Sequence, residues 1–260
     1  MKNGKRSPIK DKPLRNPGQS LDEQLDELVI DKISQPLIIA LLLVVLAGLE
    51  WSRYYFPQKP SPILYTVGAL AGVGYAAYQI WRVWPRLRAL KLGRDGEKVV
   101  GQYLERLRET GYQVFHDVVG TGFNVDHVLI GPAGVFTIET KTFSKRPSSD
   151  AKVTFDGERL VVDGHEPDRD PVVQAKAQAR WLRELLAEST GRKFAVRPVI
   201  VFPGWWVEQS KGSTREVWVL EPKALPGFLA QEPEVLSPED VKLASYHLSR
   251  FIRTGESTQR

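Results

Sequence analysis

The sequence predicts an α/β domain, built on a mixed sheet with helices on both faces and preceded by two transmembrane helices. Three observations lead to this fold class. The chain of 260 residues has room for one ordinary core-bearing domain plus additional segments. Its apolar residues are concentrated in two runs within residues 33–84. From residue 85 onward, helix-like and strand-like patterns alternate with continuous apolar runs, which is typical of a sheet covered on both faces.

The composition limits the chemistry that the chain can perform. It contains no cysteine, which excludes a disulfide framework, cysteine-ligated zinc, an iron–sulfur cluster and a thiol nucleophile. The formal net charge is +5, but from residue 85 onward 26 basic and 24 acidic residues nearly balance. The soluble part is therefore not a strongly electrostatic binder, and any contact with nucleic acid must come from local patches.

Residues 33–84 are predicted to form a transmembrane helical hairpin. Residues 62–81 carry no formal charge over twenty positions, enough to span roughly 30 Å. The earlier apolar run, residues 36–49, is shorter, and with its flanks it gives a span over residues 33–51. A loop at residues 57–61 then returns the chain to its starting side. The alternative for each run is a buried core helix, although such helices rarely run this long without a charged face.

Basic residues predict the orientation of the hairpin. The first span is preceded by basic residues that include Lys2, Lys5, Arg6, Lys10, Lys12 and Arg15, and the second is followed by Arg82, Arg86, Arg88, Lys91 and Arg94. The connecting region offers only Arg53 and Lys59. Both ends should therefore face the cytoplasm, as in a multi-pass protein of the inner (cytoplasmic) membrane with its soluble domain in the cytoplasm. Gly68 and Gly72 would allow close packing, either of the two helices or of two protomers in a homo-oligomer.

Residues 1–32 are predicted to be a cytosolic N-terminal tail. The first 19 residues are rich in Pro, Lys and Arg, a composition typical of disorder. Ser20 then resembles an N-cap, with Glu23 completing a capping box. Apolar residues at helical spacing follow, so the tail should end in a short amphipathic helix.

The soluble domain is predicted to contain the following elements in order. A helix over residues 93–110 should end at Gly111. Strands should follow at residues 112–119, 124–130 and 135–142, and a further hairpin at residues 152–162. A helix over residues 171–189 begins with proline in its first turn. The remaining elements are strands at residues 195–203 and 215–220 and a closing helix at residues 238–253.

The hairpin around residues 131–134 carries the chemically informative side chains. If Gly131 pairs with Gly134, Asp126 lies directly opposite Glu139, with β-carbons about 5 Å apart. Lys141, two residues beyond Glu139, shares its face. Two opposed carboxylates in apolar strands resist joint ionisation unless a cation lies between them. Magnesium characteristically takes one or two carboxylates plus waters and phosphates. The alternative is a structural carboxylate cluster bridged by the lysine.

The stretch from Val125 to Lys141, VDHVLIGPAGVFTIETK, resembles the core of the nuclease-related domain, NERD, of the PD-(D/E)xK nuclease superfamily. The preceding Gly93-x-x-Gly96-Glu97 and the later Asp170-Pro171-Val172-Val173-Gln174 match its flanking motifs, with Asp170 where asparagine is expected. The resemblance covers residues 93–203, and residues 204–260 are predicted to be a C-terminal extension that packs on this domain.

The resemblance implies a restriction-endonuclease-like α/β/α sandwich and a phosphodiesterase site that depends on Mg²⁺ or Mn²⁺. Asp126, Glu139 and Glu97 would be metal ligands and Lys141 would be catalytic. Gln174 would orient substrate or water. Every acid and the lysine of this site are present in the chain. The expected substrate is nucleic acid, DNA rather than RNA.

A second hypothesis belongs to a different class of function. The chain could be a non-catalytic, membrane-tethered module that binds nucleic acid or recruits a partner, because a fold does not by itself imply turnover. The complete set of carboxylates and lysine argues against this hypothesis, and the nearly balanced charge argues weakly for it. A transporter or channel is not supported, since Glu50 and Arg53 lie near an interface and two spans offer no ion path.

Overall fold

The computed structural model of the chain describes residues 14–56, 62–145, 152–210 and 216–255. Two compact units form it. One is helical and comprises residues 20–92, and the other is an α/β unit made of the residues on either side of it in the sequence. Residues 14–19 thus group with the α/β unit, although the sequence predicted them as part of a disordered tail. The described residues do not include the basic tail before residue 14, the connecting loop at residues 57–61 or the basic residue Arg146.

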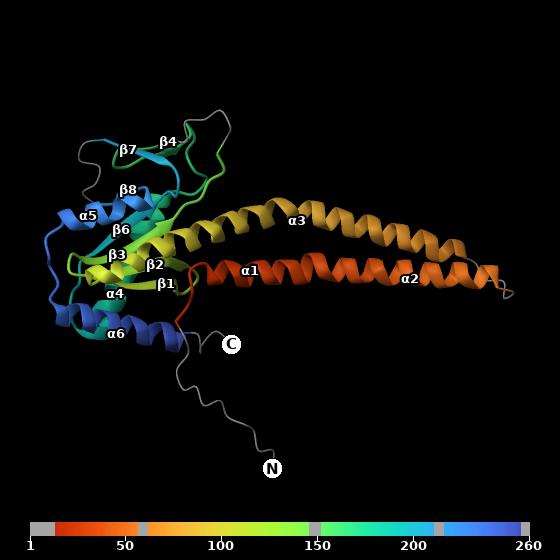
Figure 1. The fold of residues 1–260 in the computed structure, drawn as a ribbon, viewed down its shortest axis with the longest axis horizontal. Helices are drawn as coiled ribbons and strands as arrows, with labels where there is room; N and C mark the ends of the chain where they lie inside the picture. The colour runs from red at the N-terminus through yellow and green to blue at the C-terminus, as the bar shows by residue number, and fades with distance from the viewer. Residues whose placement is uncertain (1–13, 57–61, 146–151, 211–215, 256–260) are drawn as a thin grey trace, which may run out of the picture. The chain divides into compact units, whose positions relative to one another are not determined.

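The helical unit is built from three helices (Figure 1). Helix α1 spans Gln19–Val29 and continues through a π-helical turn, Ile30–Ser34, into α2, Gln35–Tyr55. Helix α3 spans Pro62–Glu105 and contains Pro85. The sequence analysis placed a transmembrane span before residue 84 and a separate helix from residue 93, and the structure joins the two in one helix. The residues after Pro85 are mainly Arg, Leu, Lys and Ala, strong helix formers that let the helix continue past one missing hydrogen bond.

Small residues bring α2 and α3 together within the helical unit. A β-carbon at Gly72 would lie 2.5 Å from Leu43 Cδ1 and 3.7 Å from Ala40 Cα, whereas Gly68 has nothing within 4 Å. Gly72 therefore serves the contact between the two helices. Both helices are long and apolar enough to cross a membrane. In the apolar 18-residue stretch of each, only 22% and 11% respectively is buried inside the protein.

The α/β unit is centred on a five-stranded mixed sheet of order β1-β2-β3-β6-β8. Its first three strands are β1, Gln113–Val119, β2, Asn124–Gly131, and β3, Gly134–Thr140. Strand β2 pairs antiparallel with both β1 and β3. Strands β6, Val196–Val201, and β8, Trp218–Leu220, continue the sheet parallel to β3. A second sheet of order β5-β4-β7 comprises Leu160–Val162, Lys152–Phe155 and Trp206–Gln209.

Helices cover both faces of the five-stranded sheet (Figure 1). The end of α3 and α5, Leu225–Gln231, share one core with residues such as Phe136 and Trp218. Helices α4, Pro171–Thr190, and α6, Pro238–Gly255, share the other. The predicted α/β sandwich with a mixed sheet is therefore confirmed. The sequence missed β7 and α5, and it did not predict that residues 152–162 would join a separate sheet.

Candidate active site

The β2–β3 hairpin has the register that the sequence predicts. Gly131 pairs with Gly134 and His127 pairs with Ile138, so Asp126 and Glu139 occupy the next opposed positions. Asp126 Oδ2 accepts a hydrogen bond of 2.7 Å from the backbone N–H of Thr140. The two acids therefore meet at the end of β3, where the parallel strands β3, β6 and β8 also end. The carboxyl edge of parallel strands is the usual place for a ligand site in an α/β sheet.

Glu139, Lys141 and Gln174 form one hydrogen-bonded group. Lys141 Nζ lies 2.7 Å from Glu139 Oε1 and 2.9 Å from Gln174 Oε1. Gln174 Nε2 donates a third bond, of 2.7 Å, to the same Glu139 oxygen. The Glu139 side chain is only 4% exposed, whereas that of Lys141 is 24% exposed. A buried carboxylate thus holds an ammonium group that solvent, and hence a substrate, can reach.

Gln174 reaches this group because of the way α4 begins. Asp170 caps the helix, with Oδ1 accepting from Val172 N at 2.8 Å and Val173 N at 3.4 Å. Pro171 occupies the first helical position, where its missing N–H costs nothing. Asp170 therefore caps α4 and places Gln174 in its first turn.

Gln178 is a site residue that the sequence reading missed. Its side chain is 2% exposed, and its Nε2 donates to Glu139 Oε2 at 2.6 Å and to the Asn124 carbonyl at 2.9 Å. Gln178 lies one turn beyond Gln174 on α4, so the two amides share a helix face. The four-residue spacing between Gln174 and Gln178 is the feature of the sequence that could have indicated this role. The structure assigns both glutamines to holding the Glu139 carboxylate.

Glu97 enters the site from α3. The preceding Gly96 lies directly against the chain that leaves β3, because a β-carbon at Gly96 would be 1.9 Å from Thr142 Cγ2. Only glycine permits this close approach. Glu97 is partly buried, and its negative charge acts on Asp126. The structure therefore brings all five predicted site residues to one end of the sheet.

The electrostatics of Asp126 are unfavourable without a cation. Burial raises the pKa of its carboxyl group well above the ordinary aspartate value, and the charges of Glu139 and Glu97 raise it further. The Thr140 hydrogen bond and the Lys141 charge offset only part of this rise. Ionisation of Asp126 is therefore opposed both by burial and by two neighbouring acids.

The histidines of the adjacent strands do not supply ligands to this cluster. His116 Nδ1 lies 2.9 Å from His127 Nδ1, and His116 Nε2 lies 2.9 Å from Glu105 Oε1. Burial lowers the pKa of both imidazoles, that of His127 strongly, so both are neutral near pH 7. Both histidines therefore act as structural residues of the paired strands β1 and β2.

The donor chemistry of the site suits a hard divalent cation. In the described part of the chain, no three acidic or histidine side chains are grouped closely enough to enclose an ion. Magnesium does not need such a cage, since it keeps several waters and takes one or two carboxylates with substrate phosphates. Asp126 and Glu139 provide that pair, and a cation between them would offset the repulsion that raises the pKa of Asp126.

Fold and site together define an α/β/α domain with an acidic cluster and a lysine at the carboxyl edge of its parallel strands. Residues 92–203, less than half of the chain, match the model of the nuclease-related domain, NERD. Every residue of the cluster lies inside that match. The family match suggests a nuclease-like function.

Individual proteins resemble the chain over only part of its length. An uncharacterised protein of Bacillus anthracis is 38% identical over 56 residues, which are 20% of this chain and 26% of that protein. The chain thus matches about a quarter of the length of that relative. The structure of SfsA from Pyrococcus furiosus in complex with Ca²⁺ is 18% identical and covers 47% of this chain and 52% of that one, with a TM-score of 0.23. A TM-score this low does not establish a shared fold.

Proposed function

We propose that the chain is a metal-dependent nuclease of the PD-(D/E)xK type that hydrolyses phosphodiester bonds of nucleic acid, with DNA as the preferred substrate. One observation carries the proposal. Asp126, Glu139, Lys141 and Gln174 converge at the end of β3, inside the region that matches the nuclease-related domain. Glu139 is buried and Lys141 is accessible, as a site that holds a cation and touches a phosphate requires.

Asp126 and Glu139 would hold the cation, and Glu97, whose charge acts on Asp126, would contribute from α3. When bound, Mg²⁺ or Mn²⁺ supplies Lewis acidity toward a phosphoryl oxygen and lowers the pKa of an attacking water. The protein contributes placement. Gln174 and Gln178 each donate to Glu139, so that carboxylate has a fixed orientation before any ligand arrives. Preorganisation of this kind is what electrostatic catalysis requires.

Lys141 would act on the scissile phosphate. Its ammonium group is held by Glu139 and by the amide oxygen of Gln174, which leaves one of its three donors for another acceptor. A phosphate oxygen at that position would receive a charge-assisted hydrogen bond, and the negative charge that develops during hydrolysis would be stabilised there.

The direct test is cleavage by the purified full-length protein in detergent. Labelled single-stranded and double-stranded DNA and RNA are each incubated with Mg²⁺, Mn²⁺ or EDTA. Cleavage of DNA that requires the divalent ion supports the proposal, and a preference for RNA would revise the substrate. If none of the four substrates is cleaved with either ion, the proposed activity is wrong.

Asp126→Asn is expected to raise the Tm of the metal-free protein at neutral pH. Because the pKa of Asp126 is raised in the folded state, the folded protein holds this proton more tightly than the unfolded chain does. Ionisation of this carboxyl group therefore begins to lower the stability when the pH exceeds the ordinary pKa of aspartate. The loss of stability is complete when the pH exceeds the raised pKa of the folded state. The difference in Tm between variant and wild type should open as the pH rises and vanish near about pH 3.

Addition of Mg²⁺ separates the proposed metal site from a merely strained carboxyl group. The ion should raise the Tm of the wild type, because it binds the folded state, and leave the Asp126→Asn variant almost unchanged. An equal shift in both proteins would show that the ion binds elsewhere. A lower Tm for the metal-free variant would mean that Asp126 stabilises the fold.

The helical unit supports a further part of the proposal, attachment to a membrane. The inner membrane, with both ends and the α/β unit in the cytoplasm, is proposed from the distribution of basic residues in the sequence. Large apolar side chains are exposed along α2 and α3, among them Leu41, Leu42, Leu70 and Trp81, which are 59% to 74% exposed. Contiguous apolar surface of this extent needs an apolar environment. Lipid provides it for two helices long enough to cross a bilayer.

Membrane attachment should survive an alkaline wash and depend on the centre of the hairpin. In isolated membranes the wild type should stay in the pellet, and the double variant Leu41→Arg/Leu70→Arg should be lost from it. Each arginine costs roughly 2.5–3.5 kcal/mol at the centre of a span. Val235→Arg, at an exposed position of the α/β unit, is the matched control and should stay in the pellet. Release of the wild type by the wash would contradict the anchor.

One observation favours the non-catalytic alternative. Both Glu139 oxygens already have hydrogen-bond donors, Lys141 and Gln174 on one and Gln178 on the other, so this carboxylate is satisfied without a metal. A binding module would use that arrangement as a rigid surface. Binding of DNA that is insensitive to EDTA and unchanged in Asp126→Asn, without cleavage, would favour this function.

A further inference from the structure

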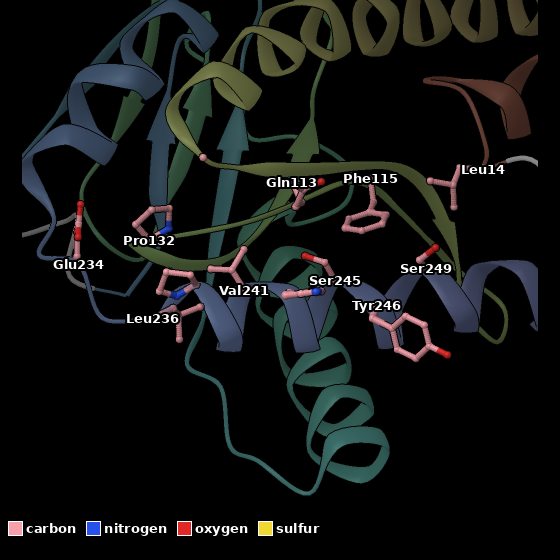
Figure 2. A pocket seen from close by; sticks show the side chains of 13 residues that line it. Leu14, Gln113, Phe115, Pro132, Glu234, Leu236, Val241, Ser245, Tyr246 and Ser249 are labelled. Carbon is pink, nitrogen blue, oxygen red and sulfur yellow. The ribbon is translucent and has the colours of Figure 1, made fainter.

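Residues 14–18, the N-terminal segment, form part of the α/β unit although residues 20–92 separate them in sequence from the remainder of that unit. Leu14 lines the same pocket as Gln113 and Phe115 of β1 (Figure 2). Pro17 lies against α3, where a β-carbon at Gly101 would be 2.5 Å from Pro17 Cγ. The segment therefore packs against both an edge strand and a helix of the domain.

Between these two contacts, Arg15 makes a buried ion pair. Its Nε donates to Asp117 Oδ2 at 2.7 Å, and the two side chains are 7% and 3% exposed. Asp117 is also conformationally unusual, because its φ of 49° places a non-glycine residue in the left-handed region. A strained backbone and a buried charge persist only where the surroundings hold them in place. Arg15 supplies a cation for the buried Asp117 carboxylate.

A continuous path of hydrogen bonds leads from this ion pair to the active site. Asn124 Nδ2 donates to the second oxygen of Asp117, Oδ1, at 3.2 Å. The backbone carbonyl oxygen of Asn124 accepts a hydrogen bond from Gln178 Nε2, which also donates to Glu139 Oε2. Asn124 begins β2, two residues before Asp126. The position of Asn124 thus affects the proposed metal ligand Glu139 through Gln178.

We infer that Arg15 is a positioning residue for the active site, acting through Asp117, Asn124 and Gln178 on the Glu139 carboxylate. Only the expected effect of Arg15 on catalysis rests on the proposed nuclease function. The nuclease domain is then discontinuous in sequence, and the N-terminal segment belongs to it together with the residues from 93 onward. A fragment that begins after the helical hairpin would lack Arg15 and leave Asp117 without this partner.

The test uses the full-length protein in detergent and two variants that disturb the path at different points. Arg15→Met removes the cation and keeps most of the side-chain length. Gly101→Ala displaces Pro17 and leaves every member of the path intact. Arg159→Met is the matched control, because it removes an arginine from an exposed ion pair with Glu166.

Arg15→Met and Gly101→Ala should each lower kcat by about 10–100-fold, the usual effect of losing a residue that supports a metal ligand, while KM stays nearly constant. The decisive readout is the Gln178→Leu background. If Arg15 acts through Gln178, Arg15→Met should lower Tm in that background without lowering kcat further. A merely structural Arg15 would lower kcat by the same factor in both backgrounds, which would overturn the inference, as would an unchanged kcat in Arg15→Met.

Hydrogen–deuterium exchange provides a readout that does not require activity. Arg15→Met should accelerate exchange in residues 117–126 and in the first two turns of α4, and Arg159→Met should not. If the wild type does not cleave nucleic acid but this response is seen, the proposed function fails and the structural link stands. If exchange in these two regions does not change, the link itself is wrong.

Discussion

Lys141→Met should reduce the rate of phosphodiester cleavage by roughly 10²–10⁴-fold, the range that a single positioned catalytic group contributes. The reason is electrostatic. Methionine fills a similar volume but has no positive charge to place beside the phosphate. Glu139 would keep its bonds from Gln174 and Gln178, so the carboxylate and any cation on it should remain. The loss should therefore fall on kcat, measured at saturating Mg²⁺.

The matched control for this variant is Lys242→Met, which removes a lysine from the exposed surface of α6. It should cleave at the wild-type rate, and both variants should keep the far-ultraviolet circular dichroism of the wild type. If Lys141→Met cleaves as fast as Lys242→Met, Lys141 is a structural partner of Glu139 and not a catalytic group.

Gly96→Ala should lower both stability and activity, although alanine is the better helix former. The new methyl group would lie 1.9 Å from Thr142 Cγ2, so α3 and the chain that leaves β3 must separate. Overpacking of this kind costs about 1–3 kcal/mol of unfolding free energy. The separation also moves Glu97 away from Asp126, and a shift of about 1 Å in a catalytic constellation can cost 10²-fold in rate. Thermal unfolding and the cleavage assay measure the two effects.

A second substitution distinguishes this clash from other causes. Thr142→Ser removes the Cγ2 methyl group and should restore part of the stability and activity in the Gly96→Ala background. Gly227→Ala, in α5 with nothing within 4 Å, is the control and should be neutral or slightly stabilising. Failure of Thr142→Ser to rescue would show that the Gly96 contact is not what limits the variant.

The sequence predicted the centre of this site because the signal there is local. A short turn between Gly131 and Gly134 fixes the strand register, and register decides which side chains face each other. Asp126, Glu139 and Lys141 follow from that rule alone. The family resemblance added Glu97 and Gln174, which no local rule connects to the hairpin. Their positions depend on how α3 and α4 pack.

Other features could not be predicted because they depend on tertiary contacts between distant segments. Gln178 becomes part of the site only because α4 lies on the Glu139 face of the sheet. Arg15 stands in a stretch whose composition indicates disorder, and its role requires Asp117, 102 residues away. The continuation of α3 through Pro85 was missed for a different reason. Proline lowers helix propensity locally, but the helix formers that follow outweigh it.

The most direct test of the central claim is a Mg²⁺ titration of DNA cleavage by the full-length protein, with wild type and Glu139→Gln measured side by side. The proposed site predicts saturable, Mg²⁺-dependent cleavage by the wild type and almost none by the variant, because the amide keeps the shape of the side chain but loses the charge that binds the ion. Equal cleavage by both proteins, or none by the wild type at any Mg²⁺ concentration, would contradict it.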